Sequence, residues 1–339
     1  MKRWKNTAGS LLALAAVLTA AFLVFRGHWE EIWANLQGVP LSGALALFTL
    51  AAAYQLLESG ICAVLVRARL PGFTFREAME VTFLGVFGNV ATCAVGSIPM
   101  QSLRLRQCGL TIGHGVGMMT VEYIFHKSSI LLYAAVMLLF QGGWLRETVP
   151  DLTRYLLPGF GVCAAVSAAL VLVCTWGRLR DLVLHLIGLL PETERWEKRK
   201  DVWRTNLASL YTESQHVLKS RTCCGKILLL NGTKLLCLYS AAYLAVRLLG
   251  AEGLPFWRAQ LLAALMLLIA SALPNVAGVG PAEFAFLLLF GRYMDYARAS
   301  AALVLYRTAT YFFPFAVSAL FALRIQRRTW QLSGEEDEK

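Results

Sequence analysis

Glu122, His126 and Lys127 lie together in one apolar stretch of the sequence. In a helix, Glu122 and His126 share a face because they are four residues apart, and Lys127 adjoins it. A carboxylate beside an imidazole can act as general acid and base, as a membrane transferase or lipid hydrolase would require. The same residues can instead form a structural cluster that neutralises its own charge, or the polar wall of a substrate cavity. No nucleophile motif accompanies them, so we predict no catalytic residues and keep the last two interpretations open.

Arg307 is a second charge within an apolar stretch, and no acidic residue lies near it in the sequence. A charge in mid-membrane costs roughly 2.5 kcal/mol or more without a partner, so Glu283 or Glu122 can pair with it across the fold. Alternatively, its planar guanidinium can bind the phosphate of a headgroup, which arginine does better than lysine. The candidate substrate-binding residues are Arg307, Glu283, Glu122, His126, Lys127, Asn89, Gln101 and Asn275.

Two apolar stretches contain the residues that interrupt helices. Residues 271–283 hold two prolines and two glycines, and residues 88–101 hold a similar set. An offset of 182 places Gly278 on Gly96, Pro281 on Pro99 and Glu283 on Gln101. Broken backbone survives at membrane depth only where it is buried in protein or lines a wet cavity, and paired breaks are typical of transporters. The predicted hairpin breaks are at Gly96, Pro99, Pro274, Gly278, Gly280 and Pro281.

Asn89 and Asn275 lie near the tips of these predicted hairpins. An amide there can satisfy backbone groups that the break sets free, or it can bind a ligand. Both interpretations stay open from the sequence.

Composition places the chain in the membrane. Hydrophobic residues make up 57% of it, charged residues only 16%, and the mean hydropathy is +0.56. Several apolar runs are near 20 residues long, so the predicted class is an all-α polytopic membrane protein in a single domain, 1–339. We predict about six spanning helices plus two broken, re-entrant hairpins. The predicted spans cover about 7–25, 41–66, 114–140, 155–176, 226–249 and 299–323, and the broken segments about 78–107 and 256–290.

The predicted halves of the chain, 41–140 and 226–323, have opposite topology. Three spans separate the two hairpins, so the first enters from the cytoplasm and the second from outside, which makes an inverted repeat. Between them, residues 177–225 combine charged residues with apolar ones at helical spacing, as in amphipathic helices on a membrane surface. Residues 324–339 form a cytoplasmic tail.

The net charge of +11 follows from topology. We predict that the chain lies in the plasma membrane with both termini in the cytoplasm. In this orientation, the basic clusters lie on the cytoplasmic side. We therefore predict no nucleic-acid partner. The 8 cysteines form no C-x-x-C pair, so we predict no metal site and no cofactor. The inner clusters are Lys2–Lys5, Arg67–Arg76, Arg104–Arg106, Arg178–Lys226 and Arg324–Arg328.

The run from Leu273 to Glu283, followed by Tyr306-Arg307, resembles the signature of the lysylphosphatidylglycerol synthase/flippase membrane region. Asn89, Gly96 and Pro99 match its first half more loosely, together with Arg104 and Val121-Glu122-Tyr123. The sequence departs from the family at Tyr123, where arginine is common, and at Pro281, which interrupts a glycine-rich run.

The resemblance implies a flippase that moves phospholipid, including aminoacylated lipid such as lysylphosphatidylglycerol, between leaflets. The expected partner is membrane phospholipid, with a separate lipid-modifying synthase as a further one. The family's soluble aminoacyl-transferase domain has no counterpart after Trp330, so we expect no enzyme activity even if a lysyltransferase name is inherited. The alternatives are a membrane enzyme, an accessory subunit of lipid aminoacylation and a small-solute carrier. No nucleotide-binding motif is present, so movement would not be driven by a nucleotide.

Overall fold

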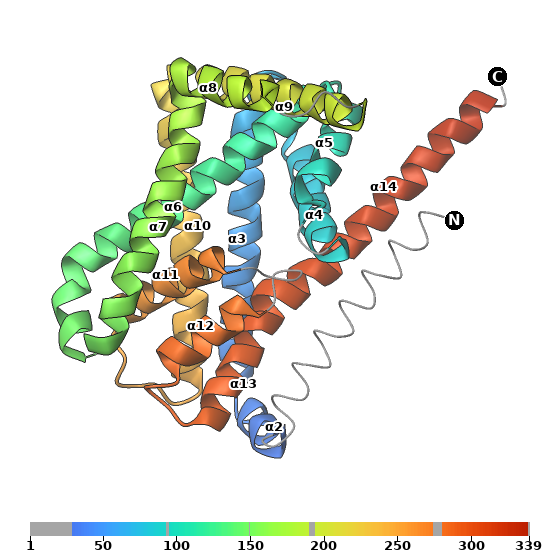
Figure 1. Cartoon of the computed structure of the whole chain (residues 1–339). Helices are drawn as coiled ribbons and strands as arrows, with labels where there is room; N and C mark the ends of the chain where they lie inside the picture. Colours follow the sequence, from blue (N-terminus) through green and yellow to red (C-terminus); the bar gives the residue numbers. More distant parts are fainter. Residues whose placement is uncertain (1–28, 93–94, 149, 190–193, 274–279, 338–339) are drawn as a thin grey trace. The chain divides into compact units, whose positions relative to one another are not determined.

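The computed structural model describes residues 29–92, 95–148, 150–189, 194–273 and 280–337. The described part is almost entirely helical and contains no strand, which confirms the all-α class (Figure 1). The helices are α2 (Trp29–Gln37), α3 (Leu41–Arg67), α4 (Phe75–Ala91), α5 (Ser97–Gln107), α6 (Ile112–Thr148), α7 (Pro150–Thr175), α8 (Gly177–Gly188), α9 (Glu194–Lys219), α10 (Arg221–Leu248), α11 (Phe256–Ala272), α12 (Pro281–Phe290), α13 (Tyr296–Arg307), the π-helical turn η2 (Thr308–Phe312) and α14 (Phe313–Asp337).

Within the described residues, four helical stretches are long and apolar enough to cross a membrane: Leu41–Arg67, Ile112–Thr148, Arg221–Leu248 and Tyr296–Ile325. Shorter apolar helices are Ala164–Thr175, Phe256–Ser271 and Pro281–Phe290. Large apolar side chains project outward from the spans, with Leu139 85% and Leu229 72% exposed. Apolar surface of this kind is stable against lipid tails rather than water. The membrane class is therefore supported, whereas the number of six spans stays a prediction. The first of them, 7–25, lies outside the described residues.

The chain divides into two compact units. Unit 1 comprises residues up to Leu56, Met79–Met100 and Leu236 onward. Unit 2 comprises Leu57–Ala78 and Gln101–Leu235. The predicted repeat halves, the surface segment 177–225 and the tail 324–339 are divisions of another kind, and they stay predictions.

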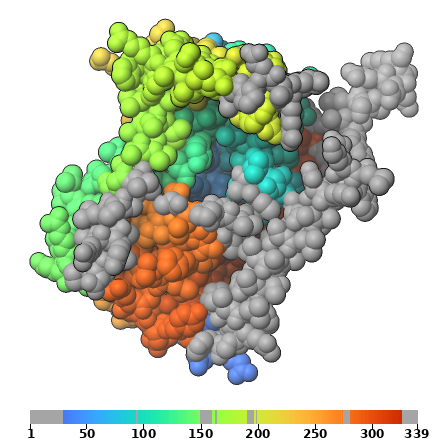
Figure 2. Space-filling model, in the orientation of Figure 1, coloured from blue at the N-terminus to red at the C-terminus, as the bar shows by residue number. Residues whose placement is uncertain are grey.

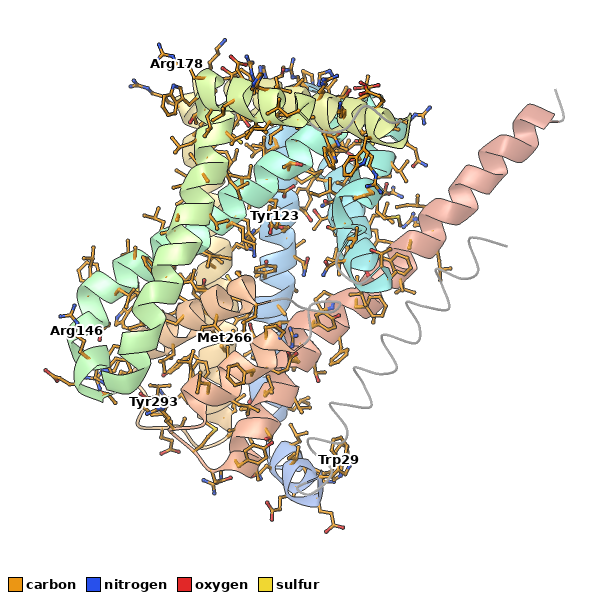
Figure 3. The ribbon with its side chains drawn as sticks, viewed as in Figure 1. Trp29, Tyr123, Arg146, Arg178, Met266 and Tyr293 are labelled. Atoms are coloured by element: carbon orange, nitrogen blue, oxygen red, sulfur yellow. The ribbon has the colours of Figure 1, made fainter. Side chains whose placement is uncertain are left out.

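In unit 2, α6 and α7 form an antiparallel pair, and α8 and α9 run across one end of it (Figure 1). Arg146 near the end of α6 and Arg178 near the start of α8 lie beyond the two ends of α7 (Figure 3). In the space-filling view, α8 and α9 form a band along their end of the unit, interrupted by grey atoms (Figure 2). This band follows from the sequence: α9 carries apolar residues at helical spacing among many charged ones, and its apolar stripe packs on α6 and α7.

In unit 1, α11 packs against α12, α12 against α13, and α13 against α2. The core between α12 and α13 is aromatic: Phe286 stacks on Tyr306, with ring centroids 5.6 Å apart, and both side chains are buried. Stacked aromatic pairs of this kind fix the position of one short helix on the next. The core therefore holds the start of α12 close to the end of α13.

Both broken segments leave the helical conformation where proline and glycine cluster. α4 ends at Ala91 and α5 begins at Ser97, while α11 ends at Ala272 and α12 begins at Pro281. Leu273 is already extended, with φ −98° and ψ 144°. That each pair of helices returns to the same membrane face stays a prediction. Pro274, Asn275 and Gly278 lie outside the described residues.

Candidate functional sites

The start of α12 is built from the residues that the sequence marked as a break. Gly280 has a φ of +107°, a backbone conformation that residues with a Cβ rarely adopt. Pro281 follows as the first helical residue, where its missing N–H leaves no bond unmade. Glu283 accepts a hydrogen bond from the Gly280 backbone N–H at 2.6 Å, which satisfies a free donor and places negative charge at the positive end of the helix.

Arg307 forms an ion pair with the same Glu283, through both Nε and a terminal guanidinium nitrogen. The two side chains are only 13% and 22% exposed. The Arg307 guanidinium also lies 4.8 Å from the centroid of the Tyr311 ring. Of the partners predicted for Arg307, the structure of unit 1 places Glu283 beside it. Glu283 therefore connects three features: a helix start, an arginine and a strained glycine.

Arg307 is the last residue before the π-helical turn η2. Thr308 and Thr310 donate side-chain hydrogen bonds to carbonyls four residues earlier, at 2.7 Å each. Side-chain hydrogen bonds from Thr to the carbonyl four residues earlier often bend a helix. Single π-helical turns occur frequently at functional sites. The span that carries Arg307 is thus locally irregular where its charge lies.

The first break, in its described residues 88–92 and 95–101, has no charged side chain. Gly88 and Gly96 approach so closely that a Cβ on Gly88 would lie 2.5 Å from the Gly96 carbonyl oxygen. Thr92 donates to the Gly88 carbonyl at 2.7 Å and closes the end of α4. Pro99 lies inside α5, and Asn89 is partly buried on α4. Backbone packing therefore defines this break.

Unit 2 contains a buried polar cluster on three helices. Lys234 of α10 is fully buried and forms an ion pair with Glu58 of α3. Glu122 of α6 is 6% exposed and interacts electrostatically with both. His126 interacts with Asn231, whose amide nitrogen donates to the Ile227 carbonyl. These polar groups stabilise one another within an apolar bundle.

Several atoms of this cluster accept or donate no hydrogen bond within the described residues. They are Glu122 Oε1, His126 Nδ1, Ser129 Oγ and Asn231 Oδ1. Glu122 and His126 are on one face of α6 as predicted, but these free atoms show that they do not form a tight hydrogen-bonded pair. Lys127 lies beside the ring of Tyr123, 5.4 Å from its centroid. Gln101 is partly buried at the middle of α5.

Glu213 of α9 is a buried charge that the sequence analysis did not single out. Its side chain is 1% exposed and is bonded to His114 Nδ1 at 2.7 Å and to Arg69 at 3.2 Å. The sequence contains a signal for this burial: at helical spacing, Glu213 shares a face with Leu210 and Val217, which pack in the apolar core of unit 2. A charge in an apolar stripe needs a buried partner. The network ties α9 to the turn after α3 and to the start of α6.

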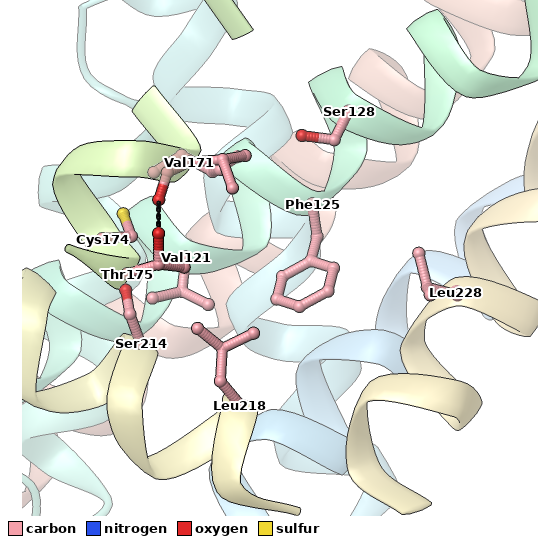
Figure 4. A pocket seen from close by; sticks show the side chains of 10 residues that line it. Val121, Phe125, Ser128, Val171, Cys174, Thr175, Ser214, Leu218 and Leu228 are labelled. Atoms are coloured by element: carbon pink, nitrogen blue, oxygen red, sulfur yellow. Dashed lines mark hydrogen bonds between the residues drawn. The ribbon is translucent and has the colours of Figure 1, made fainter. Parts of the chain in front are cut away.

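A cavity of about 140 Å³ lies beside this core in unit 2 (Figure 4). Phe125 projects into it from α6, opposite Val171 of α7 and Leu218 of α9. The Thr175 hydroxyl on its wall donates to the Val171 carbonyl at 2.9 Å. The lining is mostly apolar, and the hydroxyls of Thr175 and Ser214 already donate to backbone carbonyls of their own helices, so the cavity is poorly suited to a charged headgroup.

These features define a class: a helical membrane protein with interrupted helices and with ion pairs in apolar surroundings. In the described part of the chain, no group of three or more His, Cys, Asp or Glu side chains is arranged to hold a metal ion. Residues 10–318 match the family model described as the lysylphosphatidylglycerol synthase TM region.

The chain therefore belongs to this family, as the resemblance predicted, and has a membrane role related to lysylphosphatidylglycerol synthesis. A search among curated proteins gave no match.

Proposed function

We propose that the chain is a flippase that moves phospholipid headgroups, including aminoacylated ones, between the leaflets of the plasma membrane. The observation that carries this proposal is the Arg307–Glu283 pair at the start of α12. An arginine held by one carboxylate, only partly exposed and next to a helix start, is a ready site for a phosphate anion. Membership of the family supplies the lipid.

The proposed step is an exchange of partners. In the resting protein, Glu283 neutralises Arg307 and closes the free N–H of Gly280. An arriving phosphate carries the charge and the acceptor oxygens to replace Glu283 on the guanidinium, in two parallel hydrogen bonds. The carboxylate that is displaced still caps α12. The headgroup thus enters without leaving an unpaired charge, and the acyl chains stay in the bilayer.

We also propose that this region performs no chemical step of its own. No nucleophile motif accompanies Glu122 and His126 in the sequence, which does not favour a transferase or hydrolase. A separate synthase would then make the lipid. Incubation with labelled phospholipid, followed by analysis of the lipid for any covalent change, tests this point: unchanged lipid supports the proposal, and a new lipid species contradicts it.

The proposed orientation places both termini, α8 and α9 in the cytoplasm. It is supported by the basic residues of these helices and by the contacts of Glu213 with Arg69 and His114, which bring α9 to the basic turn after α3. Cysteines introduced at 195–205 should react only with reagent on the cytoplasmic side. Those near Asp151 and Asp295 should react only from outside.

Flipping is tested with purified protein in phosphatidylethanolamine/phosphatidylglycerol vesicles that contain fluorescent phosphatidylglycerol. Dithionite bleaches only the outer leaflet, so a protein-dependent rise in the bleached fraction measures transport. Vesicles with the protein should bleach nearly completely, whereas protein-free vesicles should stop at about half. Equal bleaching in both would contradict the flippase proposal.

A further inference from the structure

We infer that Glu122 is a proton-binding site that couples lipid movement to a transmembrane proton gradient. This inference rests on the proposed flippase function and names its source of energy. It assigns a role to the polar cluster of unit 2, which the exchange at Arg307 does not use.

The cluster holds two carboxylates for one buried ammonium group. Lys234 is fully buried and ion-paired to Glu58. Glu122 interacts electrostatically with the same lysine and with Glu58, yet its Oε1 accepts no hydrogen bond from any described residue. A second negative charge in such a place is costly unless something neutralises it. A proton is the smallest neutralising species, and it needs no further space.

A route for the proton continues along the same helices. His126 lies one turn from Glu122 and interacts with Asn231 of α10, while His126 Nδ1 and Asn231 Oδ1 remain without hydrogen-bond partners in unit 2. Ser129 Oγ, a further turn along one side of α6, is also buried and without a partner there. Buried polar atoms of this kind hold ordered water, and water between them transfers protons. Intramembrane Glu and His residues in chains are typical of proton relays.

Other titratable groups lie on the same helices. Cys62 on α3 is a buried thiol that interacts with Glu122. Lys127 on α6 directs its ammonium to the Tyr123 ring. The titratable groups around the cluster are thus Glu58 and Cys62 on α3, His126 and Lys127 on α6, and Lys234 on α10.

The proposed step is a reversible proton transfer. Water at one membrane face gives a proton to the Glu122 carboxylate, which becomes a neutral carboxylic acid. The acid form then releases the same proton to water at the other face. No electron moves and no bond other than O–H is made or broken. If one proton accompanies each lipid, a gradient of one pH unit can enrich the lipid about tenfold in one leaflet at equilibrium.

The experiment uses full-length protein in phosphatidylethanolamine/phosphatidylglycerol vesicles with fluorescent phosphatidylglycerol and a pH-sensitive dye in the lumen. A gradient of about one pH unit is imposed in either direction. The wild type should enrich the probe lipid up to about tenfold and move protons with it, and the enriched leaflet should change when the gradient is reversed. Glu122→Gln should flip lipid without enrichment and without proton movement.

The controls separate titration from structure. Glu147→Gln removes an exposed carboxylate from the same helix and should behave as the wild type does. Glu122→Asp keeps a titratable group and should retain enrichment. If Glu122→Gln does not fold, as judged by yield and thermal unfolding, the enrichment and proton signals of the wild type and Glu122→Asp decide the outcome.

Two results would overturn the inference and leave the flippase proposal intact: gradient-driven enrichment by folded Glu122→Gln, or wild-type flipping that ignores the gradient. A third result would also overturn the inference: if Glu122→Gln lowers the flipping rate equally at every gradient, Glu122 is a headgroup contact. Absence of flipping by the wild type under all conditions would overturn the proposed function itself.

Discussion

The two broken segments share their interrupting residues but are held together by different forces. At the first, Gly88 and Gly96 bring backbone against backbone, and the polar contact at the end of α4 is that of Thr92 with the Gly88 carbonyl. At the second, a glycine with positive φ precedes a helix whose start is bonded to Glu283, which also holds Arg307. Close backbone contact marks the first break, and an ion pair marks the helix start after the second.

This difference assigns separate roles to the two breaks. A backbone contact without charge offers little to an anionic headgroup, whereas an ion pair at a helix start can exchange one anion for another. The offset of 182 places Gln101 where the second half has Glu283, so the first half lacks the carboxylate that would make the same pair. We therefore expect the second break to bind the headgroup and the first to serve as a rigid support.

The largest loss of stability should come from adding a Cβ at Gly88, where the first break is most tightly packed. A Cβ at Gly88 would lie 2.5 Å from the Gly96 carbonyl oxygen, so Gly88→Ala forces the backbone apart and should lower the free energy of unfolding by about 3 kcal/mol. Thermal unfolding in detergent measures this loss. The matched control is Gly142→Ala on α6, where nothing lies within 4 Å of the new Cβ. An unchanged unfolding temperature for Gly88→Ala would contradict the tight contact.

A smaller loss of stability should follow substitution at the second break. Gly280 has open space around the position of a Cβ, so Gly280→Ala is strained only by its φ of +107°, at about 2 kcal/mol. Because this strain shifts the Gly280 N–H away from Glu283, flipping should fall more than stability does. Parallel measurements of unfolding and dithionite bleaching check this. Equal transport by Gly280→Ala and Gly142→Ala would remove the second break from the mechanism.

The smallest effect concerns the entry to the first broken segment, where Thr74 and Glu77 cap α4. The Thr74 backbone N–H donates to Glu77 at 2.8 Å and holds the pKa of that carboxyl below its usual value. A lowered folded pKa means that the stabilisation is present above the ordinary value of 4.5 and is lost as pH falls through the folded value.

Thr74→Ala should therefore cost about 1 kcal/mol near neutral pH, and Glu77→Gln should differ from the wild type less at pH 4 than at pH 7. The measurement is the unfolding temperature of the wild type, Thr74→Ala and Glu77→Gln at both pH values. A difference between Glu77→Gln and the wild type that grows in acid would contradict the cap.

The sequence predicted the class and the breaks because proline, glycine and long apolar runs act locally on the backbone. It also identified Arg307 as a charge that needs a partner. It left Glu283 and Glu122 as alternatives, since that choice depends on packing between helices distant in sequence. The pairing of Lys234 with Glu58 depends on tertiary packing in the same way, because the two residues lie on helices far apart in the sequence. Glu213 was missed because α9 carries many charges, and its place in the apolar stripe was not weighed.

The central claim is that Arg307 binds the headgroup phosphate and Glu283 holds its place in the resting protein. The most direct test measures flipping of fluorescent phosphatidylglycerol by Arg307→Lys, Arg307→Ala and the double variant Arg307→Ala/Glu283→Gln, with yield and unfolding temperature as controls. Lysine keeps the charge but not the two parallel donors, and charge-assisted bonds of this kind contribute roughly 1.5–3 kcal/mol. We predict that Arg307→Lys flips lipid at least about tenfold more slowly than the wild type and that Arg307→Ala is slower again. The double variant should not regain transport, even where its folding recovers. Full transport by the double variant would show that the pair is only structural and that the headgroup binds elsewhere.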